Sequence, residues 1–341
     1  LYGEFKSALY GLIDERFEAY FGTDHPADIR LDEVVWGGVL QDGIPPLRTP
    51  SMIAAAEASY LAESDVIFGI VVGSQARAYP RRILGWHEMF VDEIAGVPLA
   101  GVYCTLCGSM ILYRTKVGGV RHELGTSGFL YRSNKLMYDR ATSSLWNTLW
   151  GEPVIGPLAG QGIALQRMPV VTTTWGEWRR RHPDTRVLSL QTGHSRDYSE
   201  GAAYRDYFAT DELMFPVPTL DTRLRNKDEV LGLVFPGSPR DVLAISAAYL
   251  SAHPVHNDTV GQVQLVVLTD RSGASRVYEA QDVEFVEFDR DATATDKRGV
   301  RWQLAEDELV AADGSRLRRL PAHRAFWFGW YSAYNSTRLV H

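Results

Sequence analysis

The sequence predicts a β-rich α+β fold with two pseudo-repeated lobes and an N-terminal amphipathic helix. Three observations predict this class: short β-branched and aromatic runs separated by Gly and Pro, few helical stretches, and segments that recur at a fixed distance. The 341 residues are 45% hydrophobic and 23% charged. These values are typical of a globular protein that buries a core without disulfides.

The first 60 residues are predicted to form a helix and a connector. Residues 5–21 place Phe5, Leu9, Ile13, Phe17 and Tyr20 at spacings of four and three, a helical period, and we expect this apolar stripe to pack on the main body. The run DGIPPLRTP that follows at 42–50 is typical of a rigid, polyproline-like connector.

An internal repeat organises the rest of the chain. One segment recurs at an offset of 152 residues: Leu165-Gln-Arg-Met-Pro169 matches Leu317-Arg-Arg-Leu-Pro321 (317 − 165 = 152). Each copy is followed by two tryptophans at the same offset, the first of them at 175 and at 327 (327 − 175 = 152). We therefore predict lobe 1 at 61–190, a bridge at 191–228 and lobe 2 at 229–341, a degenerate copy. The helical spacing of the tryptophans predicts buried core positions, which are Trp175, Trp178, Trp327 and Trp330.

Within the lobes the residue pattern predicts strands more often than helices. Helices are expected near 174–182 and 240–250, and the sequence contains neither a GxGxxG motif nor a P-loop, which disfavours a nucleotide-binding sheet. The clearest predicted strands are 66–72, 97–103, 109–113, 264–269 and 276–279.

Charge and hydropathy exclude several classes of partner. The formal net charge of −7 gives no general attraction to nucleic acid or to anionic lipid, and no apolar run approaches the length of a membrane span. We expect a small-molecule substrate, and the oligomeric state is left open. Because the sequence begins at Leu1, we expect a natural start upstream of it, and both a cytoplasmic and an exported protein fit.

The two cysteines form one local unit, Cys104-Thr-Leu-Cys107, between two predicted strands. In the repeat alignment they fall over Thr269 and Ser272, so the frame does not need sulfur in order to fold. A thiol–disulfide CxxC of the thioredoxin type begins a helix, whereas CxxCG between strands is typical of a metal-binding knuckle. Gly108 is expected to adopt the positive φ that such a turn requires. Inert buried cysteines are the alternative structural interpretation.

Two thiolates cannot complete a four-coordinate metal site, so other residues are expected to contribute. His87 is the best candidate and Met137 the second, with Met110 and Asp139 as weaker options. Sulfur with imidazole and thioether favours a copper ion, with zinc as the alternative.

A series of motifs runs across residues 40–340. The series is AYPRRIL (78–84), WHE (86–88), YCTLCG (103–108), GTSG (125–128), MYDRATSSLW (137–146), GPLAG (156–160) and TTTWGEWRRRHPDTRVL (172–188). Together these motifs resemble the domain-of-unknown-function family 3179. The resemblance implies that His87, Glu88, Cys104, Cys107, Asp139 and Arg140 belong to one site. This chain has Val91 and Thr105 where relatives often have Asn and Pro.

From these observations we expect a metal-dependent enzyme, a redox enzyme if the metal is copper, acting on a small organic substrate. Glu88, Asp139 and Arg140 are the predicted catalytic residues, although an Asp139–Arg140 pair that only holds a turn is also consistent with the sequence. The alternatives are a non-catalytic metal carrier and a thiol–disulfide oxidoreductase. No non-metal cofactor is predicted.

Overall fold

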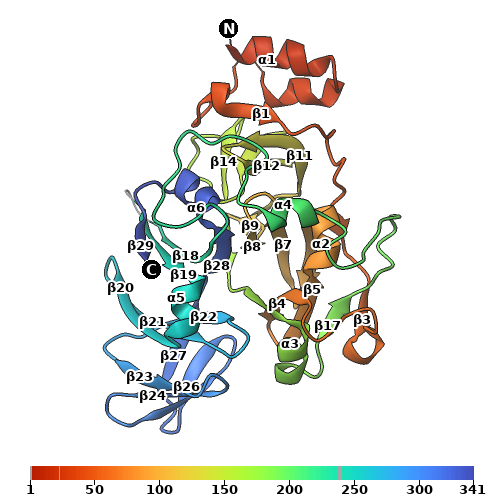
Figure 1. The fold of residues 1–341 in the computed structure, drawn as a ribbon. Coiled ribbons are helices and arrows are strands. Elements are labelled where there is room, and N and C mark those ends of the chain that lie inside the picture. The colour runs from red at the N-terminus through yellow and green to blue at the C-terminus, as the bar shows by residue number, and fades with distance from the viewer. Residues whose placement is uncertain (1, 23, 237–239) are drawn as a thin grey trace. The chain divides into compact units, whose positions relative to one another are not determined.

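The computed structural model describes residues 2–22, 24–236 and 240–341. The fold is β-rich with helices in the minority and begins with a helix, as the sequence predicts (Figure 1). The chain divides into two compact units. Unit 1 comprises Leu1–Ser51, Arg82–Arg167 and Ser189–Leu220, and unit 2 comprises Met52–Arg81, Met168–Leu188 and Asp221–His341.

Unit 1 is built around two five-stranded sheets with orders β1-β11-β12-β13-β14 and β15-β8-β7-β6-β2, beside the small pair β10-β9. Most neighbours are antiparallel hairpins, which suits the short, Gly-punctuated segments of this sequence. The strands are β1 (Val34–Trp36), β2 (Leu47–Arg48), β6 (Met89–Ile94), β7 (Val97–Cys104), β8 (Ser109–Arg114), β9 (Lys116–Val117), β10 (Val120–Arg121), β11 (Leu124–Tyr131), β12 (Asn134–Asp139), β13 (Leu145–Asn147), β14 (Glu152–Ile155) and β15 (Gln166–Met168). The helices are α1 (Tyr2–Gly11), η1 (Glu15–Tyr20), η2 (Leu31–Glu33), α2 (Arg81–His87) and α4 (Arg205–Ala209).

The predicted single helix over 5–21 is wrong in its extent. Helix α1 ends at Gly11, and η1 is a separate 3₁₀ helix whose N-cap Asp14 accepts a hydrogen bond from the Arg16 amide. Phe17 and Tyr20 pack into the aromatic core of unit 1 around Phe129. The first part of the predicted stripe is exposed instead: Phe5 is 61%, Leu9 44% and Ile13 42% exposed.

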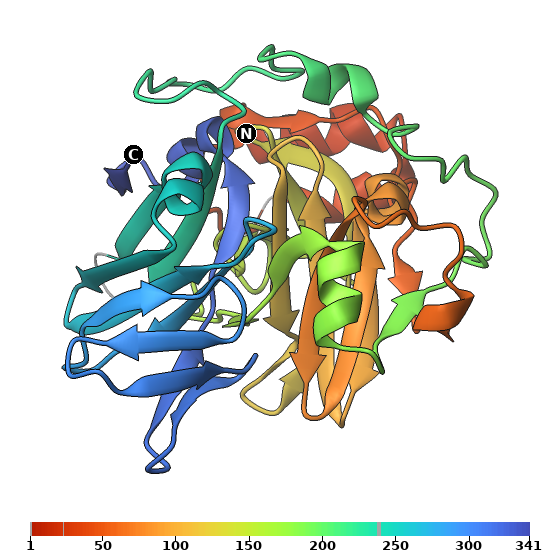
Figure 2. The ribbon, with the colours of Figure 1, turned by 60° about the horizontal axis from the view of Figure 1, so that its bottom comes forward.

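Unit 2 contains three sheets, with orders β16-β4-β5-β17-β3, β28-β18-β19-β29 and β20-β21-β22-β27-β26-β25-β24-β23. Figure 2 shows the teal and blue strands of the largest sheet following one another as hairpins. The strands are β3 (Met52–Ala54), β4 (Val66–Val72), β5 (Gln75–Pro80), β16 (Val171–Thr174), β17 (Arg186–Leu188), β18 (Glu229–Phe235), β19 (Asp241–Ser246), β20 (Val255–Val260), β21 (Val263–Thr269), β22 (Ser275–Glu279), β23 (Phe285–Phe288), β24 (Thr293–Asp296), β25 (Arg301–Leu304), β26 (Glu308–Ala311), β27 (Arg316–Leu320), β28 (His323–Phe326) and β29 (Arg338–Val340). The helices are η3 (Ala55–Glu57), α3 (Trp175–Arg181), α5 (Ala247–Ala252) and α6 (Trp327–Ala333).

Two sheets of unit 2 share one pairing pattern. In β16-β4-β5-β17 and in β28-β18-β19-β29 the first two pairings are antiparallel and the third is parallel. In each, a helix that follows the edge strand places a buried tryptophan over a strand glycine. A Cβ on Gly69 or Gly232 would lie 2.4 or 2.1 Å from the ring of Trp178 or Trp330, respectively. The predicted core role of the tryptophans is confirmed, whereas the duplication stays a prediction.

The compact units group residues 52–81 and 168–188 with residues 221–341, and the lobe boundaries stay a prediction. One predicted helix differs from the structure. The predicted helix near 240–250 is mostly strand, since β19 occupies its first half and α5 begins only at Ala247. Valine and isoleucine in that first half favour a strand over a helix. No helix among the described residues has the length and hydropathy that crossing a bilayer requires.

Candidate functional site

The CxxC segment is the turn of the β7–β8 hairpin, as the sequence predicts. Cys104 ends β7 and pairs with Ser109 at the start of β8. Gly108 has a φ of +57°, the left-handed conformation that glycine adopts without strain. Both cysteines are free thiols and both are buried.

The two sulfur atoms have different surroundings. The carbonyl oxygen of Ser133 lies 3.4 Å from Cys107 Sγ and 3.9 Å from Cys104 Sγ. A hydrogen bond from Cys107, helped by the backbone amide of Lys135, lowers the pKa of the Cys104 thiol. The same hydrogen bond together with burial raises the pKa of Cys107. The pKa of Cys104 is therefore the lower of the two.

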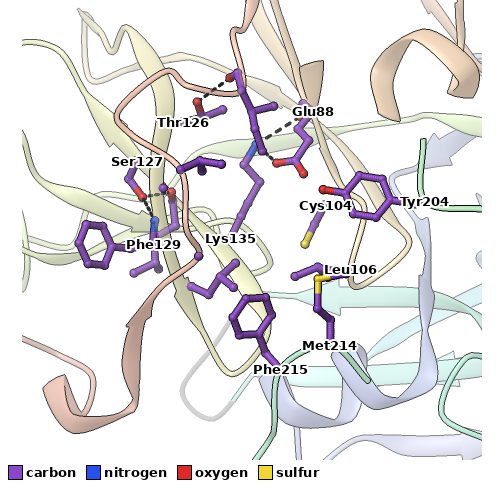
Figure 3. Close-up of a pocket in the computed structure, with 16 residues that line it drawn as sticks. Glu88, Cys104, Leu106, Thr126, Ser127, Phe129, Lys135, Tyr204, Met214 and Phe215 are labelled. Carbon is purple, nitrogen blue, oxygen red and sulfur yellow. Dashed lines mark hydrogen bonds and ion pairs between the residues drawn. The ribbon is translucent and has the colours of Figure 1, made fainter. Parts of the chain in front are cut away.

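Cys104 opens onto a pocket that lies wholly within unit 1 and has a cavity volume of about 90 Å³ (Figure 3). Cys107 does not line it. One end of the pocket is polar and the rest is apolar. Its lining residues are Gly37, Val39, Ile44, Glu88, Cys104, Leu106, Thr126, Ser127, Gly128, Phe129, Leu130, Lys135, Leu136, Tyr204, Met214 and Phe215.

The polar end of the pocket is built on Glu88 and Lys135. The Lys135 ammonium lies 3.2 Å from Glu88 Oε2, and both side chains are less than a tenth exposed. Thr105 donates a hydrogen bond of 2.9 Å to Glu88 Oε1. Burial raises the pKa of the neighbouring Tyr204 to about 12, with the Glu88 charge acting in the same direction, so this phenol stays protonated.

Glu88 occupies its position at a conformational cost. Its φ is +58°, in the left-handed region that non-glycine residues rarely adopt. This conformation turns the chain from α2 into β6, with hydrogen bonds from the Glu88 amide to Leu84 O (2.7 Å) and from the Tyr103 amide to Glu88 O (2.8 Å). A glycine would adopt this φ without strain. The strained glutamate therefore points to a role for its side chain at this position.

His87 lies outside the pocket, with both ring nitrogens engaged. Nδ1 is 2.9 Å from Pro45 O and Nε2 is 2.5 Å from the Tyr198 hydroxyl. Since a carbonyl can only accept, Nδ1 carries the proton and Nε2 accepts from the tyrosine. Burial lowers the pKa of His87 to about 4. The ring thus holds the 189–204 segment against α2 and has no nitrogen directed at the cysteines.

Two other predicted residues hold the β12–β13 hairpin. Met137 is buried opposite Trp146 on these strands and does not line the pocket. Asp139 accepts hydrogen bonds from the Thr142 amide (2.7 Å) and from Trp146 Nε1 (3.0 Å). Arg140 is exposed, 3.8 Å from Glu123. Asp139 thus holds the turn through Thr142 and Trp146, whereas Arg140 lies beside Glu123, so the expected Asp139–Arg140 pair is not the contact that holds it. The catalytic role of both residues stays a prediction.

Two pocket residues come from a segment for which the sequence offered no signal. Met214 and Phe215 belong to the predicted bridge, and Ser133 Oγ donates a 2.9 Å hydrogen bond to Phe215 O. Figure 3 shows the sulfur atoms of Cys104 and Met214 directed into the same part of the pocket. The structure thus groups Glu88, Cys104 and Met214 and leaves His87 and Met137 elsewhere.

The donor atoms available for a metal follow from this grouping. Across residues 2–22, 24–236 and 240–341, no three His, Cys, Asp or Glu side chains are grouped closely enough to hold an ion. The sulfur atoms of Cys104, Cys107 and Met214 are the donors left at the site. Such a set suits a soft ion and lacks the fourth ligand of a tetrahedral zinc site.

No match to this sequence is found among curated proteins or among solved structures. A family model described as "Protein of unknown function (DUF3179)" matches residues 41–337, which include the CxxC hairpin, the Glu88–Lys135 pair and both pocket residues of the bridge. The chain therefore belongs to the DUF3179 family of proteins of unknown function.

Proposed function

We propose that the protein is a copper-dependent oxidoreductase that acts on a small organic substrate. The observation that supports this most directly is the arrangement of sulfur at the pocket. Cys104 and Met214 line it, and the sulfur atoms of Cys104 and Cys107 lie 3.9 and 3.4 Å from the same oxygen, Ser133 O.

The donor set favours copper(I) over zinc. Thiolate and thioether ligands select copper(I) among the common metals, and this ion is stable with two or three sulfur ligands. Zinc would need a fourth donor, and the imidazole expected to supply it, His87, is committed to Pro45 and Tyr198. The residues that would hold copper are therefore Cys104 and Cys107, with Met214 in place of the His87 and Met137 expected from the sequence.

The pocket favours an enzyme over a carrier. A carrier needs an accessible metal-binding turn, whereas Cys104 is 1% exposed and faces a lined cavity with a carboxylate and an ammonium at one end. Bound copper would supply one-electron redox chemistry. With dioxygen as acceptor, removal of two electrons and two protons from a substrate is balanced by formation of one hydrogen peroxide. Glu88 is the base within the pocket for one of those protons.

Thiol–disulfide exchange is a second candidate, favoured by the asymmetry of the pair. Cys104 lines the pocket, whereas Cys107 is placed to donate a hydrogen bond to it. In this reaction the Cys104 thiolate attacks one sulfur of a small disulfide and releases the first thiol. Cys107 then attacks Cys104 of the mixed disulfide, which releases the second thiol and leaves a Cys104–Cys107 disulfide.

Anaerobic titration of the reduced protein with copper(I), in competition with a coloured copper(I) chelator, tests the proposal. We expect one copper per chain, loss of binding in Cys104→Ser/Cys107→Ser and weaker binding in Met214→Leu. Met137→Leu is the matched control, because it makes the same change at a buried methionine outside the pocket, and should bind as the parent does. Copper retained by the double cysteine variant contradicts the ligand assignment.

The same samples separate the two candidates. A protein that binds no copper but accumulates a Cys104–Cys107 disulfide on incubation with oxidised glutathione, with two thiols lost per chain, is an exchanger. A copper-loaded protein that consumes dioxygen in the presence of a substrate supports the oxidoreductase.

A further inference from the structure

We infer that the pocket selects neutral organic molecules that carry one hydroxyl group on an apolar body, that is, small alcohols and phenols. The inference names the substrate class of the proposed oxidoreductase and, as a statement about substrates, rests on that proposal. Binding itself needs no copper and is tested separately.

The walls of the pocket require an apolar body. Leu106, Phe129, Leu136 and Phe215 line it with hydrocarbon, and together with Leu130 they leave the polar groups confined to one end (Figure 3). Covering such a wall with a polar group that finds no partner costs free energy, whereas covering it with hydrocarbon is favourable. A sugar-like molecule with hydroxyls on every side is thereby disfavoured.

The two small hydroxyl residues of the lining are already used by the protein. Thr126 Oγ1 donates to Ile44 O at 2.7 Å, and Ser127 Oγ donates to Leu136 O at 2.5 Å while accepting from the Phe129 amide. Each hydroxyl has a single proton to donate, so neither offers one to a ligand. Recognition of a polar group therefore falls to Glu88, Lys135 and Tyr204.

After their contacts with the protein, Lys135 has a hydrogen-bond donor left and Glu88 has acceptor positions left. The ammonium has three donors, two of which are directed at Glu88, at Oε2 (3.2 Å) and at the backbone oxygen (3.5 Å). The carboxylate has about four acceptor positions, of which Lys135 and the Thr105 hydroxyl take one apiece. A ligand hydroxyl can accept a hydrogen bond from Lys135 and donate one to Glu88 through the same oxygen, so it uses the free donor and a free acceptor together.

Charge balance excludes the charged alternatives. The pair contributes one negative and one positive charge, and both side chains are less than a tenth exposed. A carboxylate or an ammonium on the ligand would add a third charge without a counterion among the side chains that line the pocket. Uncompensated charge in such a place is strongly unfavourable. A neutral hydroxyl adds none.

A set of near-isosteric probes tests the inference on the copper-free, reduced protein. Benzyl alcohol, benzylamine, benzoate and toluene share one ring and differ in a single polar group. Binding is measured by ligand-observed NMR with competition against benzyl alcohol. We expect benzyl alcohol to bind about tenfold more tightly than toluene, the ratio that one charge-assisted hydrogen bond supplies. Benzylamine and benzoate should bind more weakly than benzyl alcohol.

If the Glu88–Lys135 pair sets the preference for a neutral ligand, two variants should change which probe binds most tightly. Glu88→Gln leaves the Lys135 cation alone and should make benzoate the preferred ligand. Lys135→Met leaves the carboxylate alone and should make benzylamine the preferred ligand. Should either variant fail to fold, the ligand order of the unmodified protein still decides the question.

Equal binding of all four probes, binding of none, or a preference of the unmodified protein for a charged probe overturns the inference. These outcomes leave the copper titration untouched, so failure of the substrate class and failure of the proposed copper chemistry are distinguishable. If both variants fold and bind the four probes in the same order of affinity as the unmodified protein, another group recognises the polar end of the ligand, and the inference is overturned.

Discussion

Replacing Lys135 by methionine tests how strongly unit 1 depends on its buried ion pair. The charged atoms of Lys135 and Glu88 are 3.2 Å apart, and the side chains are 5% and 9% exposed. Methionine keeps most of the side-chain length but leaves the carboxylate with a neutral partner, the Thr105 hydroxyl. Breaking a buried pair in this way costs about 3–5 kcal/mol in the free energy of unfolding. Since whole domains are stable by about 5–15 kcal/mol, the loss would be conspicuous.

Urea unfolding followed by tryptophan fluorescence measures this loss, and a double-mutant cycle identifies its cause. Glu88→Gln/Lys135→Met removes both charges, so it should recover most of the stability that the single Lys135 variant loses. Lys116→Met changes an exposed lysine of the same unit and should stay within about 0.5 kcal/mol of the parent. A single variant that loses less than about 1 kcal/mol, or a double variant as unstable as the single one, would refute the reasoning.

Three further predictions test other contacts. Gly69→Ala places a Cβ 2.4 Å from the Trp178 ring and should lower the free energy of unfolding by about 1–3 kcal/mol in urea, and an unchanged midpoint would show that the ring moves aside. Burial lowers the pKa of His87 from 6.5 to about 4, so between these pH values the unfolded chain holds a proton on this residue that the folded chain does not. The free energy of unfolding should therefore fall by up to about 3 kcal/mol as the pH drops from 6.5 to 4, and His87→Gln should flatten that dependence. Trp146→Phe removes the 3.0 Å hydrogen bond to Asp139 Oδ2, an oxygen that then keeps only the Thr142 hydroxyl as donor, and should lower the free energy of unfolding by about 1–3 kcal/mol, whereas a cost near zero would show that the turn does not need the indole.

Features set by local sequence were predictable. The CxxC turn, Gly108 with its positive φ and the flanking strands all follow from residues close to one another in the chain. The tryptophan positions were predictable for a related reason, since a helical spacing beside strand-forming residues already indicates burial.

Features set by distant contacts were not predictable. Met214 reaches the pocket because residues 189–220 are held by contacts such as Tyr207 Oη to Leu106 O (2.6 Å), and this segment has no periodic pattern to show where it docks. The sequence predicts His87 among the metal ligands because it lies in the most polar stretch of lobe 1 upstream of the cysteines. Its partners Pro45 and Tyr198 are 42 and 111 residues away, and only the folded chain reveals that they occupy its nitrogens.

The interleaved order of unit 2 has a consequence for synthesis in the cell. Strand β4, with the sequence VIFGIVV, forms a hairpin with β5 early, but its other edge is completed by β16, which begins only at Val171. At about 5–20 residues per second, the ribosome takes roughly 5–20 s to make the chain between them. During that interval an apolar strand edge is open to pairing with a neighbouring nascent chain. Expression at high ribosome density should therefore yield more aggregate than slow expression at the same final protein level.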